Sequence, residues 1–80
     1  MTTQEIFNTL KEIFSTAMPQ TDISAVTLDS DLFTDLGMDS LTLLLTSLAI
    51  ENRFGIRISP QTRFVKVRDV VDYINNTINQ

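Results

Sequence analysis

The stretch "LGMDSLTLL", residues 36–44, places a single serine between an acidic residue and a run of leucines. A serine nucleophile requires a general base to take its proton and donors to stabilise an oxyanion. The chain contains no histidine and no cysteine, and its two lysines, Lys11 and Lys66, are far from Ser40 in sequence. We therefore expect no catalytic residues. An Asp-Ser pair before an apolar run is typical of a helix N-terminus, where a short polar side chain accepts from free backbone N–H groups.

A helix is expected to follow, from about Ser40 to Phe54, with Asp39 or Ser40 near its cap and Gly55 as its C-terminal stop. At about 100° of rotation per residue, its apolar side chains form two stripes on roughly opposite sides. One, called the leucine stripe below, consists of Leu41, Leu44, Leu45 and Leu48. The other consists of Leu43, Ile50 and Phe54, with Thr46 and Ser47 beside them. So short a chain has little protein to cover both sides, so one stripe should stay partly exposed as a docking surface or a ligand contact. Spacing alone does not decide which.

An earlier helix is predicted near the N-terminus. Thr2 and Glu5 have the spacing of a capping box, in which each side chain accepts from the other residue's backbone N–H. Apolar residues then recur at helical spacing as far as Ala17. Pro19 lacks an N–H and disfavours helix in the residue before it, so the helix should end near position 17 or 18.

The remaining segments complete an all-α prediction. Residues 19–39 predict a long first loop that apolar side chains pin to the core, with one helical turn near 30–35. Ser59-Pro60 predicts a short helix of a turn or two. A last helix is expected to reach position 78, with Lys66 as a poor cap, so its first turn should fray. The fold class is therefore a small bundle of three main helices plus one short helix.

Length and composition indicate a single domain, residues 1–80. No apolar run approaches the ~20 residues that span a bilayer, and the N-terminus lacks the features of a signal peptide. Without cysteine there is neither a disulfide framework nor a thiolate metal site, which fits a reducing compartment. We expect a cytoplasmic monomer without a bound metal and without an integral membrane segment.

The charges are distributed unevenly along the chain. Residues 1–52 carry eight acidic residues and one basic residue, whereas residues 53–80 carry five basic and two acidic residues, for a net charge of −4. Nucleic-acid binders are normally basic overall, so nucleic acid is not an expected partner. A protein with a basic surface is a better match for the acidic segment that ends at Ser40.

Three stretches together carry a family resemblance. These are "DLFTDLGMDSL" at 31–41, "FGIRI" at 54–58 and "VVDYI" at 70–74. Their combination closely resembles the acyl carrier protein family, in which the motif Leu-Gly-x-Asp-Ser-Leu begins the second helix. The motif matches here at Leu36, Gly37, Asp39, Ser40 and Leu41, with Met38 at the variable position. The resemblance covers nearly the whole chain.

The resemblance implies that Ser40 is esterified by 4′-phosphopantetheine, which a separate phosphopantetheinyl transferase takes from coenzyme A. That enzyme would supply the missing base, and Asp39 would serve its recognition near the metal bound with coenzyme A. The terminal thiol of the arm would hold an acyl group as a thioester. The implied partners are acyl-chain-modifying enzymes, namely synthases, acyltransferases and acyl ligases. The family alignment also turns the leucine stripe outward, as the partner-binding surface.

The sequence departs from the family along the second helix. Many fatty-acid carriers have acidic residues where this chain has Thr42, Leu45 and Arg53, and only Glu51 remains acidic in the helix. We therefore expect a specialised carrier, in fatty-acid, polyketide or related biosynthesis, that docks through apolar contact, rather than the housekeeping carrier. Two alternatives stay open. One is an aminoacyl or peptidyl carrier, and the other is a helical protein–protein interaction module in which Ser40 is only a helix cap.

Overall fold

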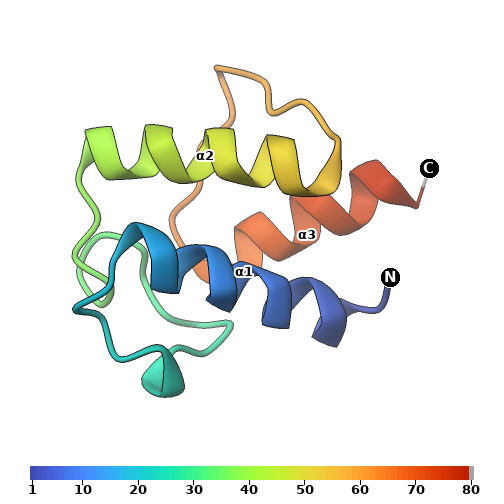
Figure 1. Cartoon of the computed structure of the whole chain (residues 1–80). Coiled ribbons are helices and arrows are strands. Elements are labelled where there is room, and N and C mark those ends of the chain that lie inside the picture. The colour runs from blue at the N-terminus through green and yellow to red at the C-terminus, as the bar shows by residue number, and fades with distance from the viewer. Residues whose placement is uncertain (80) are drawn as a thin grey trace.

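The computed structural model describes residues 1–79 and is all-helical, as predicted. Its elements are α1 (Thr3–Ala17), the 3₁₀ helix η1 (Ile23–Ala25), α2 (Ser40–Phe54) and α3 (Val67–Ile78). Figure 1 shows α1 and α2 running antiparallel, with α3 crossing beside them and the N-terminus on the same side of the molecule as the end of α3. Because α1 packs against both α2 and α3, it forms the centre of the bundle.

The α1 helix begins and ends where its sequence predicts. The Glu5 N–H donates to Thr2 Oγ1 at 3.1 Å, and the Thr2 N–H donates to Glu5 Oε1 at 2.9 Å, which completes the predicted capping box. The helix ends at Ala17, two residues before the proline. Its apolar face is fully packed, and the buried residues are Ile6, Leu10, Ile13 and Phe14.

The α2 helix has the predicted bounds. Asp39 is its N-cap, and Gly55 is its C-cap in the left-handed conformation, with φ of 67°. Glycine adopts this conformation without the steric cost that a Cβ would bring. The Gly55 N–H donates to the Glu51 carbonyl and closes the last turn.

The α3 helix corrects one prediction, because its first turn is held in place. Lys66 makes no side-chain cap, as expected. However, Asp69 Oδ2 accepts from the Lys66 N–H at 2.9 Å and the Val65 N–H at 3.0 Å. The loop also supplies two carbonyls, which accept the N–H groups of Val67 and Arg68 at 3.0 and 2.8 Å. The N–H groups of Val67 and Arg68 would be free in an isolated helix, so the predicted fraying is wrong.

The long first loop is pinned to the core, as predicted. Val26, Leu32, Leu36 and Met38 are all buried in the cluster that the helices form. The expected helical turn is present, with the Asp35 N–H donating to the Asp31 carbonyl at 3.0 Å. The helix η1 was not predicted from the sequence. Its signal was Asp22, whose Oδ1 accepts from the Ser24 N–H at 3.1 Å.

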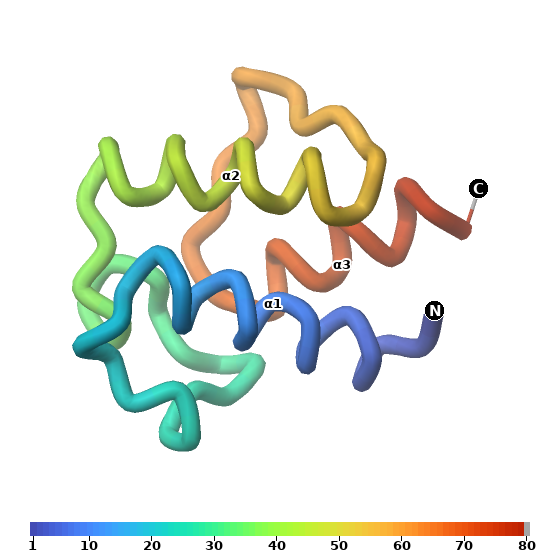
Figure 2. Tube along the Cα trace, viewed as in Figure 1, coloured from blue at the N-terminus to red at the C-terminus, as the bar shows by residue number. Residues whose placement is uncertain are grey.

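The predicted short helix at Ser59-Pro60 is wrong, because this segment forms a single turn. The Thr62 N–H donates to the Ser59 carbonyl at 2.9 Å, and no further helical bond follows within the described loop. Tyr73 explains why: its hydroxyl accepts from the Ser59 N–H at 3.2 Å and donates to the Arg57 carbonyl at 3.0 Å. These bonds tie the backbone to α3. Figure 2 shows the resulting loop arching along α2 on the side away from α1.

Candidate functional site

Ser40 is the first residue of α2 and is exposed to solvent. Among the hydrogen bonds of residues 1–79, none involves its hydroxyl. The cap before it is Asp39, whose Oδ1 accepts from the Thr42 N–H at 2.7 Å. The Thr42 N–H holds the pKa of the Asp39 carboxyl below its usual value, so this group is ionised at neutral pH. The cap prediction is confirmed, with Asp39 in that role.

The position of Ser40 is fixed by the turn that precedes it. Leu36 and Met38 are buried on either side of Gly37, which has φ of 76°. The Met38 N–H donates to the Leu32 carbonyl at 3.0 Å, and the Gly37 N–H donates to the Phe33 carbonyl at 3.1 Å. Two buried side chains and a left-handed glycine thus hold the start of α2, while its first hydroxyl faces outward.

A groove of about 470 Å³ begins at Ser40 and runs between α2 and the loop before α3. Its α2 wall includes Leu43, Leu44, Ser47, Leu48 and Glu51, and its loop wall includes Ile58, Ser59, Pro60, Thr62, Arg63 and Phe64. A volume of this order lies in the range of small-molecule sites. The loop wall was not predicted, because nothing local in the sequence indicates that residues 58–64 return to α2. Lys11 and Lys66 do not line the groove.

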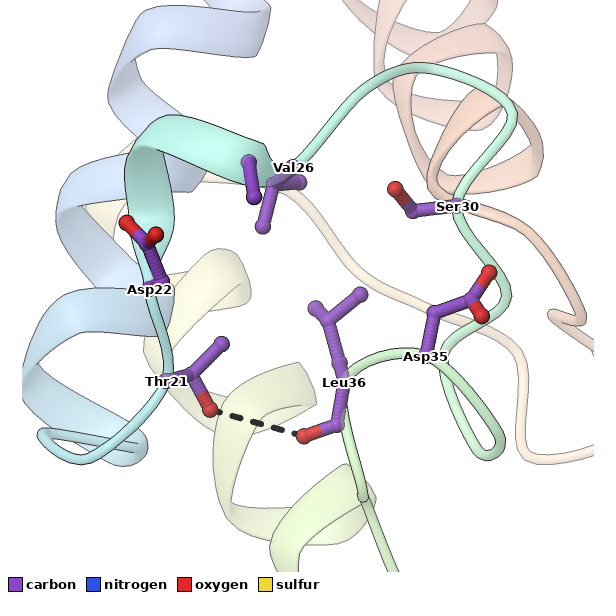
Figure 3. A pocket seen from close by; sticks show the side chains of 7 residues that line it. Thr21, Asp22, Val26, Ser30, Asp35 and Leu36 are labelled. Carbon is purple, nitrogen blue, oxygen red and sulfur yellow. Dashed lines mark hydrogen bonds between the residues drawn. The ribbon is translucent and has the colours of Figure 1, made fainter.

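A second hollow, of about 360 Å³, lies in the long first loop (Figure 3). Its lining includes two carboxylates but not Ser40. Asp22 Oδ1 accepts from the Ser24 hydroxyl at 2.6 Å, and Asp35 Oδ2 accepts from the Asp31 N–H at 2.7 Å. The carboxylates therefore bind the loop's own backbone and side chains, which indicates a structural role for this hollow.

The leucine stripe faces solvent. Its members are between 52% and 64% exposed, whereas Ile50 on the opposite side of α2 is 2% exposed. Leu43 and Phe54 are half-buried and pack against the core. The outward orientation that the family alignment implied for the stripe is confirmed. Thr46 is also on the inner face and is 2% exposed, and its hydroxyl has no hydrogen-bond partner among the described residues. An unpaired buried hydroxyl costs roughly 1–3 kcal/mol.

Residues 1–79 contain neither a candidate membrane span nor a candidate metal cluster. No helix in this part of the chain has the length and apolar character needed to cross a membrane. Likewise, no group of three potential ligands drawn from His, Cys, Asp and Glu lies close enough together to hold a metal ion.

A helical bundle that presents a free serine hydroxyl at the start of its second main helix suits a carrier of a prosthetic group. The family model described as "Phosphopantetheine attachment site" matches residues 8–74. An acyl carrier protein of Coprothermobacter proteolyticus is 36% identical over 80 residues, covering 98% of this chain and 96% of that protein. One from Campylobacter hominis is 43% identical over 54 residues, covering 65% of this chain and 68% of the relative.

A third relative is an acyl carrier protein of Campylobacter jejuni, which is 40% identical over 57 residues and covers 69% of this chain and 74% of its own. The chain belongs to the acyl carrier protein family. Its function is accordingly to carry acyl groups on a covalently attached 4′-phosphopantetheine.

Proposed function

We propose that Ser40 is the residue that carries the 4′-phosphopantetheine arm. The observation that supports this most directly is its hydroxyl, which is exposed at the start of α2 and free of protein hydrogen bonds among residues 1–79. The groove beside it offers about 470 Å³ for an arm attached at its edge. The positive end of the α2 dipole also favours a phosphodiester at this position.

In this proposal the chain presents the hydroxyl and performs no catalysis. A base of the transferase takes the Ser40 proton, the serine oxygen attacks the phosphorus that bears the pantetheine, and the adenosine bisphosphate part of coenzyme A leaves. The attached arm supplies a thiol, which holds the acyl group as a thioester. Tethering then replaces separate encounters between substrate and enzymes by recognition of one carrier surface.

We assign transferase recognition to Asp39. Its carboxylate is exposed and ionised, and its Oδ2 atom forms no hydrogen bond among those of residues 1–79. That oxygen can face a cation in the transferase complex. After modification the same charge lies next to the phosphodiester, so repulsion directs the phosphate away from the cap and toward solvent.

We further propose that the leucine stripe is the surface on which acyl-chain-modifying enzymes dock. It places four half-exposed leucines beside the attachment residue. Arg53, which stands where many family members have an acidic residue, is paired with Glu12 of α1 at 2.9 Å. The Arg53 charge therefore forms an ion pair within the chain. An apolar contact surface supports a specialised carrier, as the sequence suggested, in fatty-acid, polyketide or related biosynthesis.

Three expectations from the sequence accompany this proposal. We propose that residues 1–80 act as one domain and as a monomer, and a cytoplasmic location stays a prediction. An aminoacyl or peptidyl carrier is the second candidate, because it would use the same serine. The relatives named above are all acyl carrier proteins, which favours acyl cargo.

The test is intact mass after incubation with coenzyme A and a promiscuous phosphopantetheinyl transferase. We expect a gain of one phosphopantetheine in the natural chain and none in Ser40→Ala. Ser47→Ala is the matched control, because Ser47 lies in the same groove two turns along α2, and it should be modified normally. Modification of Ser40→Ala, or no modification of any variant, would contradict the proposal.

A further inference from the structure

The hydroxyl of Thr46 lacks the hydrogen bond that three other helical threonines make. The hydroxyls of Thr9, Thr16 and Thr77 each donate to the carbonyl four residues earlier, at 3.0, 3.3 and 2.8 Å. Thr46 makes no such bond and has no other partner among the described residues, although it is 98% buried. Thr9, Thr16 and Thr77, none of which is buried, thus pair within their helices, whereas the buried Thr46 does not.

A burial of this kind is costly, and an apolar residue of the same shape would avoid the cost. The neighbours of Thr46 on the same face of α2 are Leu43, one turn before it, and Ile50, one turn after it. Both pack in the core cluster, and Leu43 also lines the groove that begins at Ser40. Leu43 therefore lies between the groove and the unpaired hydroxyl.

We propose that Thr46 is a specificity-determining residue for the cargo, whose hydroxyl binds an oxygen substituent on an acyl chain that enters the core past Leu43. The favoured cargo is a mainly hydrocarbon chain that bears a hydroxyl or keto group. This inference rests on the proposed function, because the chain must be delivered by an arm on Ser40. It goes beyond that function by naming the class of acyl group.

The surroundings favour the cargo over the arm as the partner of Thr46. The groove wall beside Ser40 carries Ser47, Ser59, Thr62 and the charged groups of Glu51 and Arg63. The hydroxyls can pair with the amides of the arm, and Arg63 can face its phosphodiester, so the arm is better solvated in the groove than in the core. The hydrocarbon part of the cargo crosses the layer formed by Leu43 and Ile50 without losing hydration, and an oxygen substituent exchanges its hydration for the hydrogen bond to Thr46. A fully saturated chain would leave the hydroxyl unpaired, whereas an oxygenated one completes its hydrogen bond.

The experiment compares melting temperatures of the loaded protein. A promiscuous transferase attaches the arm with its chain from octanoyl-coenzyme A, or from octanoyl-coenzyme A with a hydroxyl at carbon 3, 5 or 7. Intact mass confirms loading before each melt. We expect at least one hydroxylated form to melt about 4–8 °C above the octanoyl form, the shift that one hydrogen bond gives in a domain of this size.

The variants separate a specific contact from a general effect of the cargo. Thr46→Val should raise the melting temperature of the unloaded protein and abolish the difference between the cargoes, whereas Thr46→Ser should restore that difference. Thr16→Val should retain it, since Thr16 is exposed on α1 and does not line the groove. Equal melting temperatures for all cargoes in the natural chain, or a difference that persists in Thr46→Val, would overturn the inference alone. Failure to load any chain would overturn the proposed function as well.

Discussion

The helices α2 and α3 differ in where their apolar side chains lie: most of those in α3 are buried, and most of those in α2 are exposed. In α3, Val67, Val70, Val71 and Ile74 are all at most 2% exposed, so nearly every large apolar side chain stabilises the core. In α2 only Thr46 and Ile50 are as deeply buried, while four leucines are more than half exposed. The helix with more leucine therefore contributes less to the core. The spacing of apolar residues predicts a helix. The segments packed around that helix decide whether its apolar side chains are buried in the core or exposed for contact with another protein.

The N-termini of the two helices differ in the same way. The first two N–H groups of α3 are taken by carbonyls of the long loop, and Asp69 accepts from the two N–H groups that precede the helix. In addition, Arg68 pairs with Asp29 at 2.8 Å. The start of α2 has only its own cap, Asp39, and leaves Ser40 open to solvent. The start of α3 is therefore bonded to distant parts of the chain. The start of α2, where the arm is proposed to attach, is bonded only to its own cap.

The largest expected effect is a deletion in the buried face of α3. Ile74 is fully buried, so Ile74→Ala should lower the free energy of unfolding by about 2–5 kcal/mol. Leu41→Ala, in the leucine stripe, should change it by less than ~0.5 kcal/mol. Urea unfolding followed by circular dichroism measures both. Similar losses for the two variants would show that the contrast between the helices is wrong.

A smaller effect concerns the two carboxylates that serve the helix N-termini. The N–H groups of Lys66 and Val65 hold the pKa of Asp69 below its usual 3.8, and the Thr42 N–H does the same for Asp39. A carboxyl whose pKa is lower in the folded state stabilises the fold above its unfolded pKa, and this contribution is lost as pH falls through the folded pKa. The urea midpoint should therefore be constant from pH 7 to about pH 5 and decline below about pH 4.

Replacing each carboxylate separates the contribution of Asp69 to stability from that of Asp39. Asp69→Ala should lower the urea midpoint at pH 7 more than Asp39→Ala does, because Asp69 accepts two backbone N–H bonds and Asp39 accepts one. Asp69→Ala should also show a shallower decline at acidic pH, since one depressed pKa is gone. The reverse ranking would mean that the local cap of α2 matters more to the fold than the closed end of α3.

The smallest effect on stability is expected in the leucine stripe itself. Leu45 is 55% exposed, so Leu45→Glu should change the free energy of unfolding by at most ~0.5 kcal/mol. It should nevertheless weaken binding to an acyl-chain-modifying enzyme, because a charge then enters an apolar contact. Calorimetric titration of the modified carrier into such an enzyme measures the loss. Unchanged binding would remove the leucine stripe from the proposed docking surface.

Local signals in the sequence located the helices well. The capping box at Thr2, the Asp39 cap and Gly55 each act within one turn, and the structure has each of them as predicted. The motif around Ser40 likewise indicated the family from sequence alone. The predictions that failed depend on distant partners. Tyr73 holds the loop at Ser59 out of a helix, and the long first loop closes the start of α3.

Helical spacing and caps predicted the three main helices, a serine at the start of the second, and two apolar stripes along it. Only the tertiary structure showed the groove beside Ser40 and the unpaired hydroxyl of Thr46 in the core. Helical spacing and caps reflect bonds between residues at most four positions apart. Burial and grooves arise where segments far apart in the chain meet, and no short stretch of sequence records which segments these are.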